Sequence, residues 1–157
     1  MGMARTRRQF VIDAAWALGA LGAFGAALLK PGRALADWNQ GAFGAKTVAD
    51  GMKALGIANA QESGQIVIRA PDIAENGAVV PIDVTSNIAG TTAISVFIEK
   101  NPFPYTGTFD FSKGAAPFVH LRAKVGESTP VRVVVAAGGR YYTAAKEVKV
   151  TIGGCGG

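Results

Sequence analysis

The chain has 157 residues, of which 49% are hydrophobic and 17% are charged. This length supports one domain with a substantial core and is too short for two domains of ordinary size. A single Cys excludes a disulfide within the chain, and a single His excludes a zinc site built from a histidine cluster.

The positive charge is concentrated in the first 36 residues. The whole chain has 16 Lys and Arg against 11 Asp and Glu, a formal net charge of +5. Residues 1–36 carry +4 of that charge, which leaves residues 37–157 with +1. The body is therefore nearly neutral and has no run of basic residues, so its electrostatics argue against nucleic-acid binding.

Residues 1–36 have the layout of a cleaved export signal. Arg7 and Arg8 precede an uncharged stretch, 14–29, and the Ala-Leu-Ala sequence at 34–36 is a small-x-small cleavage site. The paired arginines resemble a twin-arginine export signal. The alternative is a membrane anchor, but the uncharged stretch is shorter than the roughly 18 residues of a spanning helix. We expect residues 1–36 to be removed on export to the periplasm, with no membrane attachment afterwards.

One helix is predicted at the start of the body, over residues 42–55. Its apolar side chains Phe43, Val48, Met52 and Leu55 have spacings compatible with one helical face. Gly56 follows as a stop signal.

From residue 65 onward the hydrophobic period becomes two, which predicts strands. The seven predicted strands are 65–69, 80–84, 92–99, 118–125, 131–135, 140–143 and 147–152. No long helix separates them, which argues against a parallel sheet with helical crossovers. The predicted fold is therefore all-β, an immunoglobulin-like antiparallel β-sandwich of about seven strands that occupies residues 37–152 together with the N-terminal helix.

Several large apolar side chains do not fit a simple two-sided sandwich. They are Val79 and Phe97, which lie out of phase with the core positions of their strands, and Phe103, Phe109, Phe111 and Phe118. Either a helix or a second sheet of this chain covers them, or a partner chain does. We favour the partner, and we expect Val79 and Phe97 to be exposed in the isolated chain.

The chain ends in Gly153, Gly154, Cys155, Gly156 and Gly157. Glycine is entropically costly to order, so residues 153–157 are expected to form a flexible arm that packs against nothing. The thiol would be exposed, and no basic residue nearby in sequence favours the thiolate. We therefore expect a thiol that is activated by another protein's active site. An incidental thiol and half of an intermolecular disulfide are the alternatives.

Three stretches of the chain resemble the SoxY family, the sulfur-carrier subunits of the bacterial thiosulfate-oxidising (Sox) system. They are the ending 148–157 (VKVTIGGCGG), residues 74–81 (AENGAVVP), and residues 99–102 (EKNP) with Pro104 following. The resemblance implies that Cys155 carries sulfur intermediates covalently and that the chain forms a heterodimer with SoxZ.

The resemblance also implies a set of transient enzyme partners. A haem enzyme, SoxAX, would couple thiosulfate oxidatively to the thiol, and SoxB would remove the terminal sulfonate as sulfate by hydrolysis. A sulfane dehydrogenase, where present, would oxidise the remaining sulfur. Metals and haem belong to those enzymes, so the resemblance implies no cofactor and no metal ligand in this chain.

Two other classes of function are alternatives to the carrier. A stand-alone Cys-dependent periplasmic oxidoreductase would need a resolving Cys or an acid–base residue near Cys155, and the sequence shows neither. His120 is the only candidate base, and it shares the polar face of its predicted strand with Arg122 and Lys124, so we expect it to be solvated. A structural immunoglobulin-like envelope module would have no use for the tail. We therefore assign no catalytic residue.

Overall fold

The computed structural model describes residues 39–111 and 114–151. Two short helices come first, α2 (Gln40–Gly44) and α3 (Val48–Ala54). The strands are β1 (Gln61–Glu62), β2 (Ile66–Arg69), β3 (Ile73–Ala74), β4 (Val80–Ser86), β5 (Thr91–Ile98), β6 (Tyr105–Asp110), β7 (Phe118–Ala123), β8 (Thr129–Ala137) and β9 (Arg140–Val150). None of the helices within these two ranges has both the length and the apolar character that a membrane span requires.

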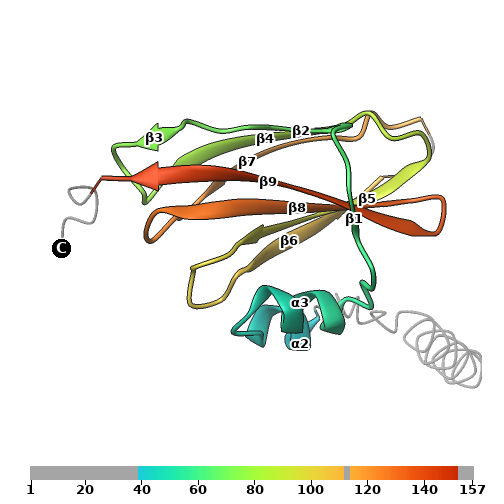
Figure 1. The fold of residues 1–157 in the computed structure, drawn as a ribbon, viewed down its shortest axis with the longest axis horizontal. Helices are drawn as coiled ribbons and strands as arrows, with labels where there is room; N and C mark the ends of the chain where they lie inside the picture. The colour runs from blue at the N-terminus through green and yellow to red at the C-terminus, as the bar shows by residue number, and fades with distance from the viewer. Residues whose placement is uncertain (1–38, 112–113, 152–157) are drawn as a thin grey trace, which may run out of the picture. The chain divides into compact units, whose positions relative to one another are not determined.

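The strands form the two sheets of a β-sandwich (Figure 1). The larger sheet has the order β1-β9-β8-β5-β6, with β3 also paired to β9, and the smaller sheet has the order β2-β4-β7. Pairing is antiparallel except where β1 and β3 run parallel to β9. The prediction of an all-β immunoglobulin-like sandwich is therefore confirmed.

The main core lies between the two sheets and is built from β-branched aliphatic side chains. Val80, Ile82 and Val84 of β4 are fully buried, which is the period-two pattern seen in the sequence. Val131, Val133 and Val135 of β8 enter the same core from the larger sheet. Branched side chains suit such a layer because they lose little rotamer freedom on a pleated surface.

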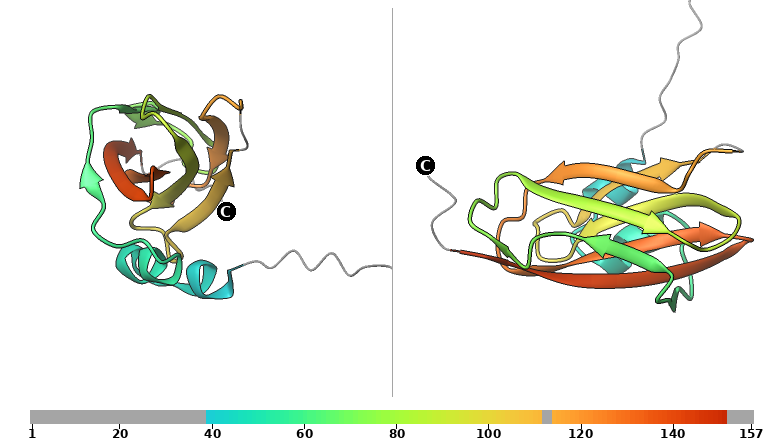
Figure 2. Two further views of the ribbon diagram at one scale, coloured as in Figure 1. Left: turned by 90° about the vertical axis from the view of Figure 1, so that its right-hand side faces the viewer. Right: turned by 90° about the horizontal axis from the view of Figure 1, so that it is seen from above.

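The larger sheet is buried on its other face as well, beneath the two helices. Figures 1 and 2 show α2 and α3 against this sheet, on the side away from the smaller sheet. Phe97, Tyr105 and Val134 form a second core there with Ala42 and Ile57. The sequence prediction that Phe97 is exposed is wrong: its exposed fraction is 0%.

Phe97 is thus covered by the helical layer of its own chain and needs no partner. Phe111 is also partly buried against the main core. Val79, Phe103, Phe109 and Phe118 are exposed. Exposure was expected for Val79 and Phe97, and it is confirmed for Val79 alone.

The single helix predicted over residues 42–55 is two helices. Ala45 has an extended backbone that ends α2, and the Thr47 hydroxyl accepts a hydrogen bond from Asp50 N at 3.1 Å to cap the start of α3. The predicted stop at Gly56 is correct. Gly56 has a φ of +70°, and Ile57 N donates to Met52 O across it at 2.9 Å, as in a Schellman motif.

The strand predictions differ from the structure in three ways: two predicted strands are one, β6 was missed, and the two-residue strands β1 and β3 were not predicted. Residues 140–143 and 147–152 were predicted as separate strands, but β9 runs without a break from Arg140 to Val150. The stretch between them, Ala144, Ala145 and Lys146, continues to pair with β8. β6 was missed because Gly107 and the threonines beside it give no apolar alternation; its pairing with β5 decides its structure.

Candidate functional site

The predicted site residues Cys155, Gly153, Gly154, Gly156 and Gly157 lie outside the described residues. The last described residue is Thr151, directly after β9. The part of the site that the structure describes is therefore the end of the sandwich at which β9 finishes. We call it the exit end and define it by residues 72–79, 99–104, 124–128 and 149–151.

β3 holds the last residues of β9 by backbone pairing at the exit end. Ala74 is in register with Val150, and Thr151 N donates to Ala74 O at 3.3 Å. The Thr151 hydroxyl also donates to Glu75 O at 3.4 Å. Backbone hydrogen bonds thus hold the chain up to Thr151, its last described residue.

Gly77 lets the loop after β3 pack tightly against the loop after β7. Val125 N donates to Gly77 O at 2.7 Å. A Cβ atom at Gly77 would overlap the carbonyl oxygen of Val125 and would lie 2.9 Å from Val150 Cγ1. Gly77 is therefore required because the backbone of Val125 passes so close to it. A side chain at this position would also press against Val150 at the end of β9.

Asn101 joins the loop after β5 to the loop after β7. Its amide nitrogen Nδ2 donates to Lys124 O at 2.8 Å, and its Oδ1 accepts from Gly126 N at 3.0 Å. Next to it, Lys100 N donates to the buried hydroxyl of Thr129 at 3.0 Å, and Lys100 Nζ donates to Ser128 O at 2.8 Å. Both motif stretches from the sequence, 74–81 and 99–102, therefore meet at the exit end.

Ser128 connects that loop to β9 itself. Val150 N donates to Ser128 Oγ at 2.9 Å, and Ser128 Oγ donates to Val150 O at 3.4 Å. One hydroxyl thus serves both backbone groups of Val150. The sequence analysis did not predict this contact, because the two residues are 22 positions apart and no single motif contains both.

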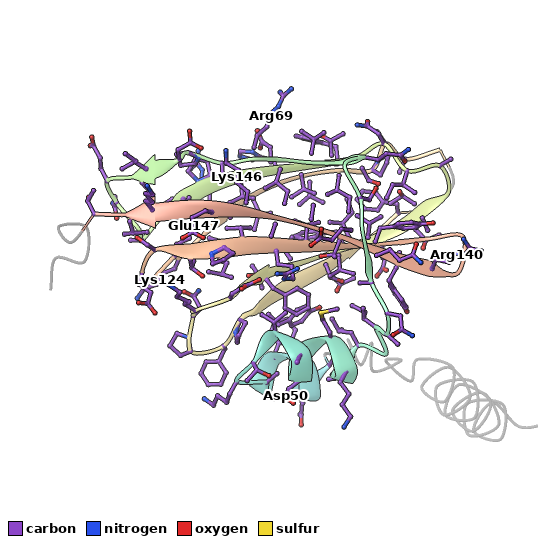
Figure 3. All side chains as sticks on the ribbon, viewed as in Figure 1. Asp50, Arg69, Lys124, Arg140, Lys146 and Glu147 are labelled. Atoms are coloured by element: carbon purple, nitrogen blue, oxygen red, sulfur yellow. The ribbon has the colours of Figure 1, made fainter. Side chains whose placement is uncertain are left out.

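Among the described residues, two ion pairs involve charged side chains at or near the exit end. Glu99 is partly buried, and Arg132 Nε donates to its Oε1 at 2.6 Å. Lys146 Nζ donates to Asp72 Oδ1 at 2.8 Å. This hydrogen bond, then the charge of Lys146 and to a lesser degree that of Lys149, lowers the pKa of Asp72 below its ordinary value. Lys124 is also exposed at this end (Figure 3).

His120 lies on the outer face of the smaller sheet and not at the exit end. It is in register with Asp83, and its Nδ1 lies 2.5 Å from Asp83 Oδ1 on an exposed surface. The prediction that His120 belongs to a polar, solvated face is confirmed. Within residues 39–111 and 114–151, no group of three or more His, Cys, Asp and Glu side chains is arranged to hold a metal ion.

The comparisons with known proteins agree with this structure. The family model described as "Sulfur oxidation protein SoxY" matches residues 52–155, a range that starts in α3 and includes Cys155. The chain belongs to the SoxY family. The structure of the sulfur carrier protein SoxY from Chlorobium limicola f thiosulfatophilum is similar at 44% identity and a TM-score of 0.59, over 64% of this chain and 92% of that one.

A second solved structure resembles the SoxY-family chain much less. The superoxide reductase (neelaredoxin) from Ignicoccus hospitalis overlaps 55% of this chain and 80% of its own at 21% identity, with a TM-score of 0.49. The comparison with curated proteins found no match.

Proposed function

We propose that this SoxY-family chain is a covalent carrier of sulfur intermediates in periplasmic thiosulfate oxidation, with Cys155 as the attachment residue. The observation that supports this most strongly is the only Cys of the chain, set between two glycine pairs at the C-terminus and included in the family match. The similar Chlorobium protein is itself described as a sulfur carrier.

Loading is an oxidative conjugation. The Cys155 thiol loses its proton, a bond forms between its sulfur and the outer sulfur of thiosulfate, and two electrons pass to a haem enzyme of the SoxAX class. Water then cleaves the terminal sulfonate from the adduct in a SoxB-type hydrolysis, which releases sulfate and leaves a persulfide on the cysteine. A sulfane dehydrogenase, where present, oxidises that sulfur before a second hydrolysis restores the thiol.

A mobile attachment site fits this cycle because one thiol must visit several enzymes. Glycines on both sides of Cys155 place no side chain beside the sulfur and leave the backbone free to rotate. We propose that residues 153–157 act as a flexible arm, that the carrier has no active site and no cofactor of its own, and that residues 1–36 direct export by the twin-arginine route.

A second, immunoglobulin-like chain of the SoxZ type is the proposed permanent partner. The exposed apolar side chains Val79, Phe103, Phe109 and Phe118 support a protein partner, because a partner could remove their apolar surface from water. Phe97 does not contribute to that argument, since the helices cover it.

The test is the Cys155→Ser variant in a reconstituted thiosulfate-oxidising system. We expect thiosulfate-dependent electron transfer to be lost, while the unfolding midpoint in urea stays the same because the substitution lies outside the sandwich core. Retention of wild-type electron transfer by this variant would refute the carrier function.

A further inference from the structure

We infer that Ser128 and Asn101 are positioning residues: they hold Val150 and Thr151, the last described residues before the proposed carrier cysteine, at one place on the sandwich. The effect that we expect on carrier loading rests on the proposed function. The hydrogen bonds from which we infer the positioning role all lie within the described residues. The inference also assigns a role to the two motif stretches, 74–81 and 99–102, that the chemistry of the thiol does not explain.

The contacts at the exit end form a continuous chain of ties across four segments. Asn101 fixes the 124–128 loop through two hydrogen bonds, and Ser128 of that loop fixes Val150 through two more. The same loop is tied to Gly77 through Val125 N. These hydrogen bonds therefore link the end of β9, directly or through the 124–128 loop, to each of the other segments.

These hydrogen bonds matter because the end of a strand that lacks a pairing partner does not keep a fixed backbone conformation. Strand β9 is paired with β8 only as far as Val148, opposite Thr129, so Lys149 to Thr151 extend beyond that ladder. Short pairing with β3 and the Ser128 hydroxyl hold these last residues. Without the hydroxyl, Val150 would lose the hydrogen bonds of both its backbone groups to Ser128, and it would keep its register with β3 and the packing of its side chain against the core.

A fixed exit point sets the reach of the thiol. Four residue steps separate Thr151 from Cys155, a span of at most about 13–14 Å when extended. Release of Val150 and Thr151 would add about 7 Å and would spread the thiol over a larger volume. The fraction of carrier molecules that present the thiol at the correct place would fall, whereas the chemistry of a thiol already in an enzyme pocket would not change.

The test compares Ser128→Ala with Ser128→Thr, which keeps the hydroxyl, and with Ser63→Ala as the matched control. Ser63 is also partly exposed and its hydroxyl also accepts from a backbone N–H, that of Gln65, but it lies beside β1. Amide hydrogen exchange at Val150 and Thr151 is measured by NMR on the full mature chain with its partner. In parallel, kcat and KM of the loading enzyme are measured with each carrier variant.

We expect exchange at Val150 and Thr151 to speed up by about 2- to 12-fold in Ser128→Ala, the factor that loss of one neutral hydrogen bond implies. KM for the carrier should rise with kcat unchanged, and Ser128→Thr should restore both values. Asn101→Ala should give the same pattern, since it releases the loop that carries Ser128. Ser63→Ala should change neither measurement.

Unchanged exchange at Val150 in both Ser128→Ala and Asn101→Ala would overturn the inference, as would faster exchange with no change in KM. These outcomes are separate from failure of the carrier function. If Cys155→Ser retained electron transfer, the carrier proposal would fail while the exchange results still decided whether Ser128 and Asn101 fix the end of β9.

Discussion

The two ends of the sandwich are held together in different ways. At the end opposite the exit, the turn between β4 and β5 closes on itself: Ser86 and Thr91 share a hydrogen bond at 2.8 Å, and Thr91 donates to Ile88 O at 2.7 Å. At the exit end, the hydrogen bonds of Asn101 and Ser128 join segments 22 to 25 residues apart. The end opposite the exit thus combines a turn closed by its own side chains with backbone hydrogen bonds to distant segments, such as Asn87 N to Gln65 O at 2.9 Å. At the exit end, the side chains of Asn101 and Ser128 themselves join distant segments.

The difference shows what each end has to do. A local turn needs only to reverse the chain, so contacts between residues close in sequence are sufficient. By the inference drawn above, the exit end holds the last residues of β9 in place, and hydrogen bonds to several independent segments serve that role. The following predictions test that contrast, from the largest expected effect to the smallest.

Gly77→Ala should be the most damaging of the glycine substitutions near the exit. The added Cβ would overlap Val125 O and press on Val150. Such overpacking costs about 1–3 kcal/mol in the free energy of unfolding, which urea denaturation measures. Gly64→Ala is the control, because it has no atom within 4 Å of the new Cβ and no left-handed backbone. Equal stability of the two variants would contradict the close packing at Gly77.

A smaller effect is expected from the exposed pair Asp72 and Lys146. The hydrogen bond and charge of Lys146 lower the pKa of Asp72, so the pair stabilises the folded chain at pH values above the ordinary range of an aspartate. That contribution is lost as the pH falls through the lowered pKa. Lys146→Met should raise the midpoint of the Asp72 carboxyl titration followed by NMR. An unchanged midpoint would show that the two side chains do not interact in solution.

The core strands could be predicted because each carries its own alternating pattern. Val80, Ile82 and Val84 indicate a buried strand without any knowledge of their neighbours. β6 was not predicted because Gly107 interrupts the apolar alternation, although its Tyr, Thr and Phe residues favour strands; its pairing with β5 compensates for that glycine. The prediction for Phe97 was wrong for a related reason: its burial depends on helices placed over the larger sheet by tertiary packing.

The residues of the candidate site also differ in whether the sequence alone reveals them. The glycine-flanked Cys155 is visible in the sequence because its chemistry depends on adjacent residues. The ties of Ser128 to Val150 and of Asn101 to Lys124 are invisible there, because they depend on which loops the topology brings to one end of the sandwich. Motif resemblance marked the 74–81 and 99–102 stretches, but only the fold shows that they meet.

The most direct test of the carrier function is intact-mass analysis of the mature chain after incubation with thiosulfate, the haem loading enzyme and an electron acceptor. We expect a thiosulfonate adduct that maps to Cys155, is absent in Cys155→Ser, and shortens to a persulfide when the hydrolytic enzyme is added. A bare thiol throughout, in a reaction that still consumes thiosulfate, would contradict the carrier function and favour a stand-alone oxidoreductase. A bare thiol with no consumption would contradict it as well and favour a structural envelope module.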